Sequence, residues 1–77
     1  MRERVRYYPD TDTMYVELRD GMVDGGEEAG KDLVIYYSED DVALGYEIES
    51  ASQHPEHIEA ALKLLREIDL EQRSAAA

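Results

Sequence analysis

The sequence predicts an α+β fold, namely a small antiparallel β-meander of about four to five strands with one C-terminal helix packed on the sheet. Between residues 4 and 49, short segments alternate apolar and polar side chains, which is typical of strands with one buried face. After residue 55, apolar side chains recur three and four positions apart, as in an amphipathic helix. Residues 1–77 are interpreted as a single domain.

The first two predicted strands are separated by a turn. Residues 4–8 and 13–19 alternate in polarity, and Pro9–Asp12 between them has turn composition, because Pro restricts φ and Asp side chains bond the backbone ahead of them. The apolar face of the second strand consists of Met14, Val16 and Leu18. Two adjacent glycines and three acids in residues 24–28 predict a loop or a ragged edge.

Two further strands are predicted in the middle of the chain. Leu33–Tyr37 is a continuous apolar run that is too short for a helix, so it is predicted to be a central strand buried on both faces. Residues 42–48 alternate again, and the side chains expected to face the core are Val42, Leu44, Tyr46 and Ile48. Ala43 and Gly45 are expected on the opposite face, where their small size would let another backbone approach.

Residues 55–72 are predicted to form the helix. Pro55 suits the first helical position, and Glu56 suits the positive end of the helix dipole. The apolar stripe expected to lie on the sheet consists of Ile58, Ala61, Leu62, Leu65 and Ile68, and Leu64 and Leu70 lie off its centre and widen it. Residues 73–77 are expected to be a frayed tail.

The charge balance restricts the class of partner. Eight basic and nineteen acidic residues give a formal net charge of −11, which repels nucleic-acid phosphates and anionic lipids. Neither nucleic acid nor a membrane is therefore an expected partner, whereas a basic protein is. The chain has no Cys, which excludes a disulfide and fits a reducing compartment, and it has no apolar run long enough to span a bilayer. We expect a cytoplasmic protein.

Small size predicts self-association. A chain of this length buries a modest share of its surface, and small domains often gain the missing burial from a second subunit. The sheet face opposite the helix would carry a contiguous apolar surface, which predicts that this face or an edge strand closes a homodimer. The alternative is that the sheet curls enough to bury both faces. The candidate interaction residues are Tyr15, Val34, Tyr36 and Tyr46.

No catalytic, cofactor or metal constellation is predicted. Asp10 and Asp12 are weak acidic-site candidates, because alternate loop acids can bind Ca²⁺ or act as an acid–base pair, although Asp in turns more often bonds the backbone. His54 and His57, with Glu56 between them, place two imidazoles on one face and are compatible with a transition metal. Since the sequence has no third His and no Cys, only weak adventitious binding is expected there.

A family resemblance emerges from the order of these segments. The stretch from Tyr7 to Leu18, and Asp12 to Leu18 within it, resembles the N-terminal part of a bacterial and archaeal family, domain of unknown function 2283. The closing strands are similar in Ile35–Tyr37, Gly45–Ile48 and Ala51–Ser52, so the resemblance covers roughly residues 4–52. Tyr8, Tyr36 and Ser38 stand where an Asp is usual in the family, which weakens a catalytic interpretation.

The predicted function follows from charge and resemblance together. The family has no accepted activity, but its members are often encoded beside suspected toxins, so the resemblance implies an antitoxin-like role. We expect a non-enzymatic acidic interaction module that binds a basic partner and needs no cofactor. One alternative is a small hydrolase or metal-dependent enzyme that uses loop carboxylates. The other is a domain that binds a small ligand at a Tyr-lined dimer seam.

Overall fold

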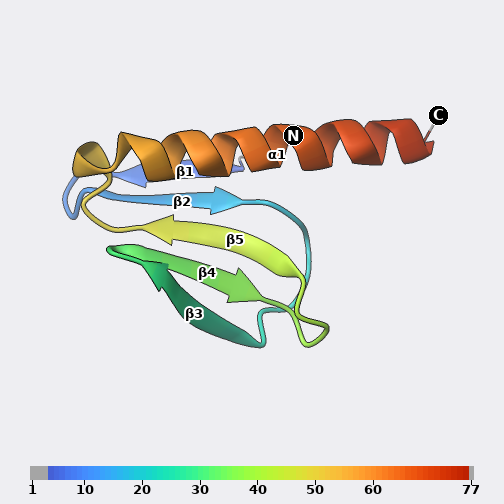
Figure 1. Ribbon diagram of the computed structural model, residues 1–77, viewed down its shortest axis with the longest axis horizontal. Coiled ribbons are helices and arrows are strands. Elements are labelled where there is room, and N and C mark those ends of the chain that lie inside the picture. The colour runs from blue at the N-terminus through green and yellow to red at the C-terminus, as the bar shows by residue number, and fades with distance from the viewer. Residues whose placement is uncertain (1–3, 77) are drawn as a thin grey trace.

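The computed structural model describes the backbone of residues 4–76 and the side chains of residues 4–73. Five antiparallel strands form one sheet, and the long C-terminal helix packs on it, so the predicted α+β class is confirmed (Figure 1). The elements are β1 (Val5–Tyr8), β2 (Thr13–Glu17), β3 (Gly25–Gly30), β4 (Leu33–Tyr37), β5 (Ala43–Ile48), a 3-10 helix η1 (Ala51–Gln53) and α1 (Pro55–Ala76).

The strand order is β1-β2-β5-β4-β3, which differs from the sequential order of a simple meander. A β1–β2 hairpin and a β3–β4–β5 meander are joined by the pairing of β2 with β5, and the chain after β2 passes the ends of β5 and β4 to reach β3 (Figure 1). This pairing sets Met14 beside Ile48 and Val16 beside Tyr46. The apolar faces of β2 and β5 therefore adjoin beneath the helix.

Strand β3 occupies the edge although its residues were expected to form a loop or a ragged edge. Its sequence, GGEEAG, supplies no large apolar side chain, but pairing with β4 satisfies its backbone on one side. Gly26 lies opposite Tyr36, and a Cβ at Gly26 would come within 3.0 Å of the Tyr36 ring. The Tyr36 ring can therefore lie close to the backbone of β3 because Gly26 has no side chain. The two glutamates of β3 leave this edge of the sheet charged.

A β-bulge corrects two predicted orientations on β5. Tyr36 pairs with Gly45 but Tyr37 pairs with Ala43, so Leu44 is an extra residue on that strand. Because one extra residue shifts the alternation, Ala43 packs against the core rather than facing outward. Val42, which was expected to face the core, is 40% exposed. β5 is also the central strand, a position that was predicted for β4.

The hydrophobic core lies between α1 and the β2–β5 pair. Its buried members are Val16, Leu18, Leu33, Ile48, Ala51, Ala61 and Ile68, and the partly buried side chains packed against them are Met14, Ala43, Tyr46, Ile58, Leu64 and Leu65. Leu62 belongs to the predicted helical stripe but is 41% exposed, while Leu64 contacts the core instead. The side of α1 that meets the sheet is thus rotated slightly from the predicted stripe.

The helix is longer than the sheet it covers. Its 22 residues correspond to about 33 Å, and its C-terminal part extends beyond the ends of the strands (Figure 1). It continues past the predicted end at residue 72; the side chains of the predicted tail from residue 74 onward, and residue 77 entirely, lie outside the described residues. Over residues 4–76, no helix is long and apolar enough to cross a membrane.

We predict that Ile48→Ala lowers the free energy of unfolding by about 2–5 kcal/mol. Ile48 is fully buried on the central strand, and truncation leaves a cavity that the packed core fills only in part. The matched control is Val42→Ala, which should cost about 1 kcal/mol or less because Val42 is exposed. Urea unfolding followed by circular dichroism measures both values, and equal losses would contradict the assigned core.

Candidate functional site

The sheet face opposite α1 brings three of the predicted interaction residues together. Side chains directly opposite each other on paired strands share a face, and the register sets Tyr15 beside Glu47 and Glu47 beside Val34. The ring centroids of Tyr15 and Tyr36 are 6.2 Å apart at an interplanar angle of 47°, within the range of a favourable aromatic pair. Tyr46 packs against the core on the α1 side, so it does not share this surface.

Two glycines give the rings their positions. A Cβ on Gly45 would lie 2.6 Å from the Tyr15 hydroxyl oxygen, and a Cβ on Gly26 would lie 3.0 Å from the Tyr36 ring. Each tyrosine therefore crosses the backbone of a neighbouring strand where that strand lacks a side chain. The two rings form a continuous aromatic surface because the strands beneath them carry glycine at these positions.

Carboxylates surround the aromatic pair. The Tyr36 hydroxyl donates a 3.2 Å hydrogen bond to Oε1 of Glu47. Burial raises the pKa of Tyr15, and the nearby Glu17 and Glu47 raise it further. Burial, followed by Glu47, likewise raises the pKa of Tyr36. The surroundings of both hydroxyls thus oppose additional negative charge. We define the tyrosine face as Arg6, Tyr15, Glu17, Glu28, Val34, Tyr36 and Glu47.

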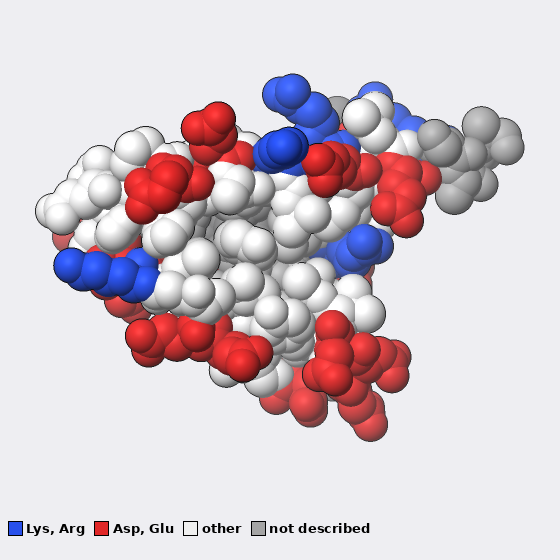
Figure 2. All heavy atoms as spheres, viewed as in Figure 1, with Lys and Arg blue, Asp and Glu red and all other residues white. Residues whose placement is uncertain are grey.

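The wider charge distribution is uneven. Asp and Glu side chains lie both on α1 and along the border of the molecule formed by β3 and the β4–β5 turn, whereas the Lys and Arg side chains in the same view lie mainly on α1 (Figure 2). The turn contributes three consecutive acids, Glu39, Asp40 and Asp41. The sheet half of the molecule therefore carries most of the negative potential.

Asp12 connects the β1–β2 turn to η1 through hydrogen bonds of its side chain and its backbone. Its carboxylate accepts hydrogen bonds from the Tyr7 hydroxyl at 2.7 Å, from the Ser52 hydroxyl at 2.6 Å and from the Ser52 amide at 3.2 Å. Its backbone carbonyl accepts a 2.8 Å bond from the amide of Ala51. The Ser52 hydroxyl and then Tyr7 lower the pKa of Asp12. Asp10 lies exposed on the same turn, and none of these hydrogen bonds reaches it.

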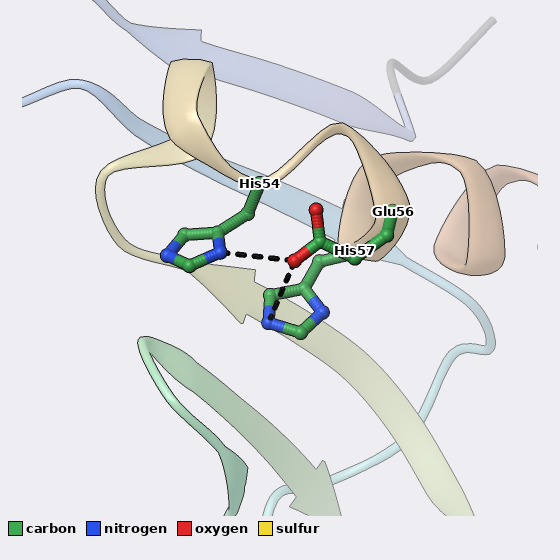
Figure 3. Close-up of side chains that lie close together, drawn as sticks. All are labelled: His54, Glu56 and His57. Carbon is green, nitrogen blue, oxygen red and sulfur yellow. Dashed lines mark hydrogen bonds and ion pairs between the residues drawn. The ribbon is translucent and has the colours of Figure 1, made fainter.

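A second polar cluster joins the β3–β4 turn to the start of α1 (Figure 3). His54 Nε2 lies 2.9 Å from Oδ2 of Asp32, and His54 Nδ1 lies 3.1 Å from Oε2 of Glu56. His57 Nε2 is 3.0 Å from the carbonyl oxygen of Lys31 and 3.9 Å from the same Glu56 oxygen. The two imidazoles stack with centroids 4.8 Å apart. We call His54, Glu56, His57 and Asp32 the histidine cluster.

The local backbone explains how the histidine cluster assembles. Ser50 and Asp32 both have positive φ, at 50° and 59°, in the left-handed region that favours short polar side chains in turns. The chain therefore reverses sharply after β5 and again before β4. Pro55 then begins α1, which orients His54 toward the β3–β4 turn. The histidine side chains are only 13% and 20% exposed, so their surroundings hold them in place.

Two carboxylates act on the same imidazole. The hydrogen bond to Asp32 is the largest cause of a raised His54 pKa, and the bond to Glu56 adds to it. The Glu56 pKa is lowered, first by a hydrogen bond from its own backbone amide at the helix start and then by His54. A protonated His54 satisfies both carboxylates at once, since imidazolium carries two N–H donors.

Comparison with known proteins gives one match. Residues 4–52, more than half of the chain, match the family described as a protein of unknown function (DUF2283). The chain belongs to this family. The resemblance inferred from the residues is therefore confirmed. No curated protein and no solved structure shows a significant match to the chain.

The DUF2283 region divides the sites that the structure reveals. It contains all five strands, and with them the tyrosine face, Asp32 and the Asp12–Ser52 connection. It ends before His54, Glu56 and His57, which lie in the segment that leads into α1. The sequence indicated the histidine pair, but it held no signal for Asp32, which is 22 positions away from His54.

We predict that His54 stabilises the fold in its protonated form. Because its folded pKa is raised above the reference value of 6.5, this contribution is fully present below pH 6.5 and is lost as pH rises through the folded pKa. The difference in unfolding free energy between the unmodified protein and His54→Gln should therefore shrink as pH rises. Proton NMR should give His54 a pKa above 6.5 that falls in Asp32→Asn. A folded pKa at or below 6.5 would contradict the cluster.

We also predict that Asp12→Asn reduces stability at neutral pH. The folded pKa of Asp12 is lowered, so its contribution is present above its unfolded value of 3.8 and is lost as pH falls through the folded pKa. The stability of unmodified protein and variant should therefore converge in acid, as followed by thermal unfolding across a pH series. The charge-matched control is Asp10→Asn, which should change little. Equal losses of stability for the two substitutions would contradict a stabilising role for the hydrogen bonds of Asp12.

Proposed function

We propose that the protein is a non-enzymatic interaction module whose tyrosine face binds a basic segment of another protein. One observation carries the proposal. The aromatic pair Tyr15–Tyr36 lies on the uncovered sheet face with Glu47 bonded to one ring's hydroxyl and Glu17 close to the other. Aromatic faces attract Arg and Lys side chains, and adjacent carboxylates complete their hydrogen bonding.

Charge complementarity supports a cationic occupant. The tyrosine face contains three carboxylates and the guanidinium of Arg6, and its Glu17 also pairs with Arg4 at 3.2 Å, on a chain with a formal net charge of −11. A field of this sign accelerates encounter with a basic partner and repels acidic ones. Arg is favoured over Lys because its planar group stacks on a ring while its donors reach a carboxylate. An antitoxin that neutralises a basic protein would use such a face.

A second copy of the chain is the alternative occupant, as small size predicts. It would bring its own three carboxylates against the same three, with Arg6 and the Arg4 that pairs with Glu17 on each side to offset them in part. Like charges placed opposite each other across an interface cost free energy. The electrostatics of this face therefore favour a basic partner over self-pairing.

The hydrolase alternative receives less support. It depends on Asp10 and Asp12, and the carboxylate of Asp12 accepts one hydrogen bond from Tyr7 of β1 and two from Ser52, which hold the β1–β2 turn to η1. A lowered pKa keeps that group ionised, which does not suit it to donate a proton near neutral pH. The ligand-binding alternative would use the same surface of Tyr15 and Tyr36. It differs from the proposal because its ligand would be a small molecule that need not carry positive charge.

We predict that a fluorescein-labelled Arg-rich peptide binds the protein and that added salt weakens the binding. Glu47→Gln should reduce affinity about tenfold, because it removes a carboxylate from the tyrosine face. Glu39→Gln makes the same change in net charge on the exposed β4–β5 turn and should reduce affinity less than twofold. Tyr15→Leu keeps the apolar area and should also weaken binding. Fluorescence anisotropy measures all four proteins.

The outcomes separate the alternatives. Equal losses for Glu47→Gln and Glu39→Gln would mean that only net charge matters, which would exclude the tyrosine face as the site. Light scattering on the free protein tests self-pairing, and a dimer that Tyr15→Arg dissociates would assign the face to a second copy. An acidic peptide of equal length that binds equally well would overturn charge recognition.

A further inference from the structure

We propose that His54, Glu56 and His57 together bind one divalent transition-metal ion at the start of α1. The three residues offer two imidazole nitrogens and one carboxylate oxygen, and these ligand atoms all lie within 4.8 Å of one another (Figure 3). Two nitrogens and one oxygen form a ligand set that suits Zn²⁺ and its neighbours rather than Ca²⁺ or Mg²⁺. This site is separate from the tyrosine face.

The separations approach those of a tetrahedral site. Ligands about 2.1 Å from a tetrahedral zinc ion lie about 3.4 Å from one another. The Oε2 atom of Glu56 lies 3.1 Å from His54 Nδ1 and 3.9 Å from His57 Nε2, close to that value on both sides. The two ring nitrogens must approach each other further. Before it can ligate, His57 Nε2 must also leave its 3.0 Å contact with the Lys31 carbonyl oxygen, because a nitrogen that donates to a carbonyl carries the proton.

Asp32 supplies an orienting contact from a different part of the chain. Its carboxylate lies 2.9 Å from His54 Nε2 and holds the proton of a neutral imidazole on that nitrogen, which leaves the lone pair of Nδ1 on the side of Glu56 for a metal ion. A neutral imidazole has one N–H and can satisfy only one of the two carboxylates. A metal ion between Nδ1 and Glu56 satisfies the other. A carboxylate that holds the far nitrogen of a ligating histidine is the usual arrangement around protein-bound zinc.

The surroundings hold the two histidines in place, whereas the side chain of Glu56 is 62% exposed. The side chains of His54 and His57 are 13% and 20% exposed, so little conformational freedom is lost when they ligate. Glu56 and Asp32 place two negative charges beside the ion, which outweigh the positive pole of α1. Three protein ligands leave a fourth position open to water or to a group from a partner.

The test is isothermal titration of the untagged protein with Zn²⁺. We predict one ion per chain, with at least tenfold weaker binding for Glu56→Gln and for His57→Gln. Glu59→Gln, one turn further along the same exposed helix surface, removes the same charge and should change affinity less than twofold. Asp32→Asn removes no ligand and should still weaken binding about tenfold or more. Circular dichroism confirms that each variant is folded.

A second readout reports the ligands directly. In proton NMR, Zn²⁺ should shift the ring resonances of both histidines together at a ratio of one, and Mg²⁺ or Ca²⁺ at the same concentration should not. Equal affinities of Glu56→Gln and Glu59→Gln, or a shift of one histidine alone, would show adventitious binding to a single ring and would overturn the site. Failure here leaves the peptide experiment unaffected, because the two sites share no residue.

Discussion

The pairing of β2 with β5 beneath α1 is the constraint on which the rest of the structure depends. It buries Val16 and Ile48 completely and sets them against Ala61 of the helix, in a chain too small to contain a second core. Side chains on a strand alternate between the two faces, so this register also decides what lies opposite the helix. Tyr15 and Glu47 form part of the uncovered face because Val16 and Ile48 must point inward.

Glycine then determines the form of that uncovered face. Gly45 on the central strand and Gly26 on the edge strand leave room for the rings of Tyr15 and Tyr36 to lie across the backbone. A strand such as β3, with two glycines and two glutamates in its first four residues, contributes nothing to the core. It fits at the edge, where its backbone pairs on one side and its charges discourage further pairing. Strand β3, which has no large apolar side chain, thus provides the backbone beside which the Tyr36 ring lies.

Two polar connections hold the passage from sheet to helix. Asp12 joins the β1–β2 turn to η1 through Ser52, and His54 joins the β3–β4 turn to α1 through Asp32. Both acids have positive φ, which turns their carboxylates toward the chain segment that follows β5. The first connection lies within the region that matches DUF2283, and the second includes residues beyond it. The sheet and its first connection therefore belong to the shared family region, whereas the histidine cluster combines that region with the helix of this chain.

The sequence by itself determined the α+β class, the bounds of β4, the start of α1 at Pro55 and the acidic character of the surface. These features depend on the polarity and backbone preference of residues that are neighbours along the chain. Only the tertiary structure decided that β2 pairs with β5, that a bulge turns Ala43 inward and that Tyr46 lies apart from Tyr15. It also decided that Asp32 meets His54. Strand register and contacts across 22 positions follow from how the whole core packs, which no local pattern encodes.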